Sequence, residues 1–203
     1  MHRNRSRLSR QHGAVLLFVL LVVLGVLLIG VSAVNLGLMD EKAAQGEGQR
    51  QLAFRAAEAA LLDAQADIEG GRGGLRAALF VAGAQGFVAG CGNGRGLPNQ
   101  GLCLPADSGP PLWQALDLAG PDSADAHWSV YGQFTGAHLA DDHSVHQPRY
   151  IIERVALAIA GEDAARWQGH CYRITAIGFG RRAGTEVVLQ SFYRKTNVKG
   201  DPP

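Results

Sequence analysis

A chain of 203 residues, 47% of them hydrophobic, is long enough for one compact domain beside a separate membrane segment. Its formal net charge is +1, and the basic residues outside the first 13 positions are scattered, so the sequence does not predict nucleic-acid binding. Residues 1–13 contain four arginines and no acidic residue. Without them, 15 Lys and Arg face 18 Asp and Glu, a formal charge of −3.

The N-terminal segment joins a basic stretch to a long uncharged one. Four arginines precede Gly13, and no charged side chain occurs over the 26 positions from Ala14 to Met39. About 20 apolar residues in a helix span a bilayer core, and a basic stretch directly before such a helix stays cytoplasmic. We therefore expect a leader at 1–13 and a single inner-membrane span at 14–39, with the N-terminus cytoplasmic and the remaining chain periplasmic.

Three interpretations of this segment compete. A cleaved secretory signal would use the small residues at 31–33, but its apolar core is usually only about 7–15 residues long. An uncleaved signal anchor fits the length and the charge bias. The third interpretation is favoured: the short basic leader with Gly13 at the polar-to-apolar junction resembles a type IV pilin signal, which is cut after the glycine. The apolar helix would then remain on the mature chain and exchange lipid for other apolar helices in a filament.

Residues 40–70 are predicted to form the second half of the same N-terminal helix. Gly46 and Gly48 each cost about 1 kcal/mol relative to alanine, so the helix could melt or bend there. From residue 51 to 69 the segment is rich in alanine. An apolar stripe recurs at three- and four-residue steps, and its members are Phe54, Ala57, Leu61, Ala64 and Ile68.

Residues 71–203 are predicted to form a globular domain. Residues 75–90 show no clear pattern, 91–127 are rich in loops, and 128–132 form a short strand. Three β-branched and aromatic segments follow, at 150–159, 171–179 and 185–194, and a glycine-bounded turn at 180–184 joins the last two. An antiparallel sheet of three or four strands, covered on one face by the helix, gives an α+β fold.

Two of the three cysteines bracket a short loop. Cys91 and Cys103 have eleven residues between them, four of them glycine, and in an oxidising compartment they are expected to form a disulfide. Closing such a loop stabilises a fold by about 3 kcal/mol in the chain-entropy model. Cys171 opens a predicted strand, where a buried free thiol is favoured over exchange with the other two cysteines.

Candidate ligands for a metal are weakly arranged. The densest group lies in one loop and comprises His138, Asp141, Asp142, His143 and His146. Asp122 and Asp125 could bind calcium, but they lack the spacing and central glycine of an EF-hand loop. A solvated polar loop is favoured, so neither a metal nor a cofactor is predicted. The nucleophile elbow, the phosphate-binding loop and the His-Glu-x-x-His motif do not occur, so the sequence predicts no enzyme.

Four segments carry a family resemblance. Arg10-Gln-His-Gly-Ala-Val-Leu-Leu17 and Arg50-Gln-Leu-Ala-Phe-Arg-Ala-Ala-Glu-Ala-Ala-Leu61 lie near the N-terminus. Tyr172-Arg-Ile-Thr-Ala-Ile-Gly-Phe-Gly180 and Val187-Val-Leu-Gln-Ser-Phe-Tyr193 lie near the C-terminus. Together they resemble the PilX family of type IV pilus minor pilins. The resemblance implies a pilin-like α+β fold, in which a long N-terminal helix packs on a small antiparallel sheet.

The resemblance also implies a function in pilus assembly. Prepilin peptidase would cleave between Gly13 and Ala14 and methylate the amine of Ala14. The mature protein would prime assembly of the pilus at or near its tip, and the pilus would serve twitching motility, adhesion or DNA uptake, between which the sequence does not choose. Its implied partners are other minor pilins, the major pilin and a large tip adhesin.

One departure from the major pilins concerns the fifth residue after the cleavage point. Major pilins usually have glutamate there, where it can neutralise the N-terminal amine of a neighbouring subunit, but this chain has Phe18. The absence of this glutamate favours a position at the filament tip, where no subunit lies ahead. A GspK-like minor pseudopilin of a type II secretion system shares this feature, but the chain after Glu69 is short for that family. A signal-anchored periplasmic binding module or enzyme is the alternative from another class.

Overall fold

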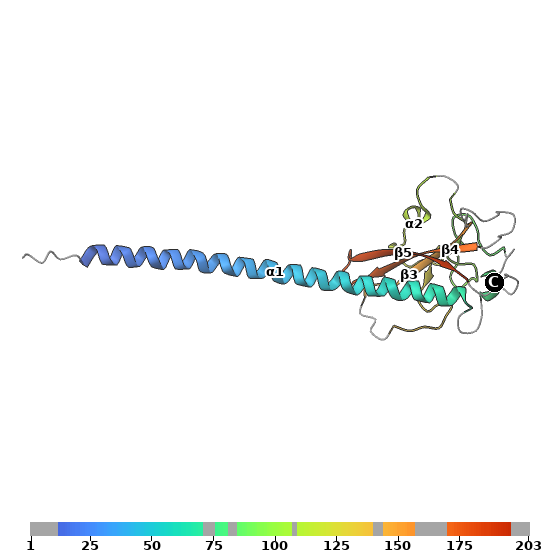
Figure 1. Cartoon of the computed structure of the whole chain (residues 1–203), viewed down its shortest axis with the longest axis horizontal. Coiled ribbons are helices and arrows are strands. Elements are labelled where there is room, and N and C mark those ends of the chain that lie inside the picture. Colours follow the sequence, from blue (N-terminus) through green and yellow to red (C-terminus); the bar gives the residue numbers. More distant parts are fainter. Residues whose placement is uncertain are drawn as a thin grey trace, which may run out of the picture. The chain divides into compact units, whose positions relative to one another are not determined.

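The computed structural model describes residues 12–70, 76–80, 85–106, 109–139, 144–156 and 170–195. The chain divides into two compact units, Met1–Glu47 and Gly48–Pro203. Figure 1 shows the elements coloured along the sequence. The predicted leader falls almost entirely outside the described residues.

The first unit contains the N-terminal part of helix α1, which runs from His12 to Ile68. Within it, Ala14–Val31 has a mean hydropathy of 3.3 and is long and apolar enough to cross a membrane. The helix does not melt at Gly46 and Gly48 but continues through both residues. Good helix formers on either side, among them Ala43 and Ala44, offset the cost of the two glycines.

The second unit contains a five-stranded sheet in the order β1-β3-β4-β5, with β2 paired to β3. Its strands are β1 (Leu102–Cys103), β2 (Ser129–Val130), β3 (Arg149–Ala156), β4 (His170–Phe179) and β5 (Glu186–Arg194). The antiparallel pairing of β3, β4 and β5 confirms the prediction, as does β2. The sheet is mixed, however, because β1 lies parallel to β3. Residues 157–159 of the predicted first strand lie outside the described residues.

One face of this sheet packs against the part of α1 that belongs to the second unit (Figure 1). The side chains at even positions of β3 and β4 point to the helix, as the two-residue period of a strand requires. The buried sheet residues on this face are Tyr150, Ile152, Tyr172, Ile174 and Ala176. The helix contributes Ala53, Ala57, Ala60, Ala64 and Ile68, all fully buried. The predicted stripe was therefore right at three positions, whereas Leu61 is only partly buried and Phe54 is 43% exposed.

The exclusion of Phe54 from the core follows from the closeness of helix and strand at Gly178. A Cβ atom added to Gly178 would lie 2.1 Å from the carbonyl oxygen of Ala53 and 2.3 Å from the amide nitrogen of Ala57. Strand β4 thus touches the helix backbone, and only alanine-sized side chains fit beside the contact. A phenylalanine ring on that face would hold the two elements apart.

Replacing Gly178 with alanine is expected to lower the free energy of unfolding by about 1–3 kcal/mol, because the helix and strand must separate to accept the methyl group. Gly48→Ala is the matched control with the opposite sign. Nothing lies within 4 Å of a Cβ at Gly48, so alanine should stabilise the helix by about 0.5–1 kcal/mol. Urea unfolding of the full chain in detergent measures both changes. Equal effects for the two variants would contradict the close contact.

The other face of the sheet is covered by the segment between the helix and β3. The buried residues of this loop layer include Cys91, Cys103, Leu112, Leu118, Ala126 and Trp128, which pack on Ile151, Ile177 and Phe179. Besides β1 and β2, this segment contains a 3-10 helix, η1 (Ala77–Phe80), and one helical turn, α2 (Leu112–Ala115). It reaches β3 and β4, but no residue of β5 belongs to this cluster.

Candidate functional site

The most ordered polar site lies where helix α1 meets the loop layer. Asp67, 3% exposed, receives two hydrogen bonds from the guanidinium of Arg76, one of them Nε to Oδ1 at 3.1 Å. The hydroxyl of Tyr150 donates to the same carboxylate at 3.1 Å. Arg76 is 1% exposed and lies over the ring of Phe134, 3.7 Å from its centroid. A helix residue, a loop residue and a strand residue are thereby joined through one buried carboxylate.

Arg76 also satisfies backbone and side-chain oxygens of the loop layer. One guanidinium nitrogen, Nη1, donates to the carbonyl of Gln100 at 2.6 Å and lies 3.4 Å from the Ser129 hydroxyl. The Gln100 side chain in turn donates to the carbonyl of Trp128 at 2.8 Å. Among the described residues, every buried side-chain nitrogen and oxygen has a hydrogen-bond partner. The network is therefore fully satisfied, which is the condition for a buried charge to be tolerated.

A second helix carboxylate, one turn before Asp67, fixes the loop after β2. Asp63 accepts a hydrogen bond from the backbone amide of Gly132 at 2.8 Å and another from the hydroxyl of Thr135. Burial away from water raises the pKa of Asp63, and the bonds from Thr135 and Gly132 oppose that shift. Burial likewise raises the pKa of the Tyr150 hydroxyl well above its usual value. This phenol therefore stays protonated and donates to Asp67.

A second buried arginine, in β3, lies on the face of the sheet that the loop layer covers. Arg149, at the start of β3, is 1% exposed and donates to the carbonyls of Leu118 at 2.8 Å and Gly120 at 2.6 Å. Its guanidinium carbon lies 4.8 Å from the ring centroid of Trp128. Asp122 pairs with it at 2.7 Å. The residue considered as a calcium ligand is therefore one half of an ion pair, and Asp125 is exposed to solvent.

Cys91 and Cys103 are joined by a disulfide with the Cα atoms 4.0 Å apart, as expected from their spacing. Both cysteines are buried, and the bond fastens the glycine-rich loop to β1. The amide of Ile152 donates to the carbonyl of Gly101 at 2.8 Å, next to the pairing of β1 with β3. Cys171 is a buried free thiol at the second position of β4, as expected.

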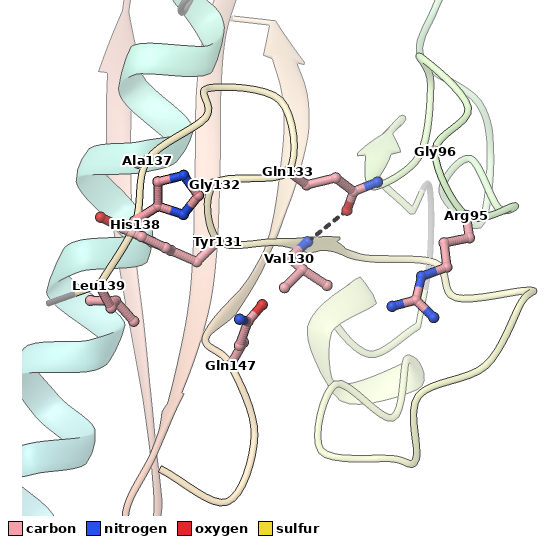
Figure 2. A pocket seen from close by; sticks show the side chains of 10 residues that line it. All are labelled: Arg95, Gly96, Val130, Tyr131, Gly132, Gln133, Ala137, His138, Leu139 and Gln147. Carbon is pink, nitrogen blue, oxygen red and sulfur yellow. Dashed lines mark hydrogen bonds between the residues drawn. The ribbon is translucent and has the colours of Figure 1, made fainter. Parts of the chain in front are cut away.

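A surface pocket of about 450 Å³ lies between the loop after β2 and the disulfide loop (Figure 2). Among the described residues, its ionisable side chains are Arg95, Tyr131 and His138, with no carboxylate or cysteine. The amide of Val130 donates to the side chain of Gln133 at 3.0 Å along its wall. The described lining residues do not pair a nucleophile with a general base.

The candidate metal ligands considered above are not brought together in the part of the chain that the structure describes. No group of three or more His, Cys, Asp or Glu side chains there could hold a metal ion. His138 lines the pocket, and the ring of His146 packs edge-on against Phe179 with centroids 5.3 Å apart. Asp141, Asp142 and His143 lie outside the described residues.

At the N-terminus, Gly13 lies in the first turn of α1 and the side chain of Ala14 is exposed. Phe18 is 67% exposed on the same apolar segment. These positions are available to other molecules, and their processing remains a prediction. Sequence reasoning missed Asp63, Asp67, Arg76 and Arg149. The only signal for these residues in the sequence was that Asp63 and Asp67 are four positions apart, on one side of the helix beside the alanine stripe.

The fold and these contacts show to which class of proteins the chain belongs. A helix with an apolar N-terminal segment, whose later turns pack on a small sheet, makes this a pilin-like α+β protein. The family model described as type IV pilus assembly protein PilX, C-terminal, matches residues 99–195. This region of the chain is therefore similar to the PilX family of type IV pilus assembly proteins. No curated protein and no solved structure matches the chain.

The family match confirms the resemblance read from the strands at 172–180 and 187–193. The N-terminal segments 10–17 and 50–61 lie outside the matched region. The PilX family of pilus assembly proteins is a structural one. The match supports a protein related to type IV pilus assembly, a family whose members suggest association with other pilus components.

Proposed function

We propose that this protein is a minor pilin that primes type IV pilus assembly and sits at or near the pilus tip. The observation that carries the proposal is helix α1 itself. The same helix contains an apolar window, Ala14–Val31, and the buried alanine face of a domain whose C-terminal region is similar to the PilX family. Such a chain can be held in the inner membrane by one segment and present a folded periplasmic domain with the other.

The proposed mechanism is association between subunits. The side chains of the apolar window are exposed in the isolated chain, with Leu16, Phe18 and Ile29 between 67% and 73% accessible. In the membrane, lipid covers them. In a filament, the equivalent apolar helices of other minor pilins and the major pilin replace the lipid, and packing between close helices drives the exchange. A large tip adhesin would be bound by the periplasmic domain.

The place at the tip is inferred from Phe18. A carboxylate at this position could pair with the N-terminal amine of the next subunit, and burying it without such a partner would be costly. Phenylalanine needs no partner, but it cannot neutralise an amine ahead of it. The subunit is therefore suited to the position with no subunit in front. GspK-like minor pseudopilins also lack the glutamate at this position. A GspK-like role in type II secretion is therefore the second candidate.

The first test is the mass and the N-terminal sequence of the protein isolated from cells with their own prepilin peptidase. A chain that begins at N-methylated Ala14 is expected. A start at Val34 would show a secreted soluble protein, and an intact Met1 would show an anchored module. Either of these results would overturn the proposal. Loss of pili with intact type II secretion in a deletion strain separates the pilus role from the GspK-like one.

Phe18→Glu tests the tip position. Because the new carboxylate supplies the contact that Phe18 lacks, we expect the variant to spread along the shaft, whereas the wild-type protein labels the filament end. Immunogold labelling of sheared pili measures the distribution. Phe18→Leu is the matched control and should keep the end label. Wild-type label along the whole shaft would contradict the assignment.

A further inference from the structure

The walls of the pocket in Figure 2 are joined to each other by hydrogen bonds. One oxygen of the Gln100 side chain accepts from the Gln133 side chain at 2.6 Å and from the amide of Gly96 at 2.9 Å. The amide of Arg95 donates to the carbonyl of Ala124 at 2.9 Å, which holds the backbone of the disulfide loop, residues 91–103, beside the pocket. The pocket is therefore formed without a ligand, and its volume of about 450 Å³ is typical of small-molecule sites.

Arg95 brings an unpaired positive charge to this pocket. Its side chain is exposed and has no hydrogen bond or ion pair with any residue that the structure describes. Other arginines of the domain differ, since Arg76, Arg149 and Arg173 each pair with a carboxylate. The described lining residues include no carboxylate that could pair with Arg95. Figure 2 shows its guanidinium extending from the disulfide loop toward β2. A cation placed in this way can take its counter-ion from solution.

The backbone amides of the pocket favour a carboxylate over a phosphate. Phosphate sites combine positive charge with several free backbone N–H groups. Here the amide of Gly96 is bound to Gln100, and the amide of Gly132 donates to Asp63 at 2.8 Å. The guanidinium of Arg95 is left to bind the anion. Its planar set of donors matches the two oxygens of one carboxylate group.

The rest of the lining mixes apolar and hydrogen-bonding side chains. Val130, Ala137 and Leu139 contribute apolar surface, whereas His138 and Gln147 contribute groups that form hydrogen bonds. A sugar ring has the same mixture, because its two faces carry C–H groups and its rim carries hydroxyl groups. The lining therefore suits a small hydroxylated ring better than a hydrocarbon chain.

We propose that this pocket binds an acidic monosaccharide. Arg95 holds the carboxylate, the ring lies against Val130 and Leu139, and its hydroxyl groups reach His138 and Gln147. The site binds its ligand without changing it, in keeping with a lining that pairs no described nucleophile with a base. This inference goes beyond the proposed function in pilus assembly. It depends neither on processing at Gly13 nor on a place at the tip, so either proposal can fail while the other stands.

Saturation-transfer NMR of the full chain in a non-ionic detergent tests the binding, with sodium glucuronate as the probe. We expect saturable binding of glucuronate and, for glucose, binding that is weaker by about 10- to 150-fold, because glucose has a similar ring without the carboxylate. Acetate, which has the carboxylate without the ring, should also bind more weakly than glucuronate. Phosphate that binds as tightly as glucuronate would show a site for inorganic anions. That result, or no saturable binding of glucuronate, would overturn the proposal.

Arg95→Met should weaken glucuronate binding by about 10- to 150-fold and leave glucose binding unchanged. The melting temperature and the Cys91–Cys103 disulfide should be retained, since the Arg95 side chain contacts no described partner. Arg181→Met is the matched control, because Arg181 is exposed in the turn between β4 and β5 and does not line the pocket. It should bind glucuronate as the wild type does. No loss with Arg95→Met, or the same loss with both variants, would overturn the proposal.

Two further variants test how the ligand lies in the pocket. Arg95→Lys keeps the charge but not the planar set of donors, so its glucuronate affinity should fall between those of the wild type and Arg95→Met. Leu139→Ala removes apolar surface under the ring, and it should weaken glucuronate and glucose alike by about 2- to 10-fold while acetate is unaffected. A lysine variant as tight as the wild type would contradict the paired contact with the carboxylate. Weaker acetate binding by Leu139→Ala would contradict the placement of the ring.

Discussion

Replacing Arg76 with methionine is expected to lower the free energy of unfolding by about 3–5 kcal/mol, the largest loss from any single side chain outside the apolar core. Methionine fills a similar volume, but it leaves Asp67 as a buried carboxylate whose remaining donor is Tyr150. The carbonyl of Gln100 loses its guanidinium donor and keeps the Ser129 hydroxyl at 2.9 Å. Urea unfolding of the full chain in detergent, followed by tryptophan fluorescence, measures the loss.

Two further variants serve as controls for this prediction. Arg95→Met changes an exposed arginine and should alter the free energy of unfolding by no more than about 0.5 kcal/mol. In the double variant Asp67→Leu with Arg76→Met, both members of the ion pair are apolar, and part of the lost stability should return. A single Arg76 variant as stable as the wild type would show that the buried pair does not hold the loop layer.

Removal of the disulfide is expected to have the second largest effect. Cys91→Ala with Cys103→Ala should cost about 3 kcal/mol, because the open loop gains conformational freedom in the unfolded chain. For a domain of this size, that loss corresponds to a fall in the melting temperature of roughly 6–12 °C. The loop between the cysteines should also become sensitive to protease, since the bond positions Gly101 for its bond to Ile152.

Cys171→Ala separates this effect from the loss of a buried sulfur. It removes the remaining thiol, 6% exposed, and leaves the Cys91–Cys103 bond in place. Its melting temperature should fall by less than that of the double alanine variant. A reducing agent should lower the melting temperature of the wild type and of Cys171→Ala, but not that of the double variant. If reduction leaves the wild type unchanged, the disulfide contributes nothing to stability.

Local patterns were enough to predict the strands that carry their own signal. β4 and β5 have alternating apolar side chains and a glycine-bounded turn, and both lie where the pattern placed them. β1 has only two residues, Leu102 and Cys103, and no period can be read from so short a segment. Its pairing depends on the disulfide and on the amide of Ile152, which lies 50 residues further along the chain. A wholly antiparallel sheet was therefore expected where a parallel strand also exists.

The buried arginines could not be predicted for a related reason. Asp67 and Tyr150 are 83 positions apart. Arg149 donates to the backbone carbonyls of Leu118 and Gly120, which lie 31 and 29 positions earlier in the chain. An isolated arginine in a loop gives no indication that it will be buried, since most arginines are exposed. Phe54 shows the reverse error. Its spacing fits the helix stripe, but only the approach of Gly178 to the helix backbone shows that a large ring is excluded.

The contact between Ala53 and Gly178 has a consequence for how the domain can form. The helix needs the sheet to cover its alanine face, yet the strands that cover it, β3 and β4, begin 81 and 102 residues after the helix ends at Ile68. A chain emerging from a ribosome or a membrane channel therefore has its first core element long before the strand that completes it. Truncation before His170 should leave much of the helix face uncovered, so that folding of the domain waits for β4 to arrive.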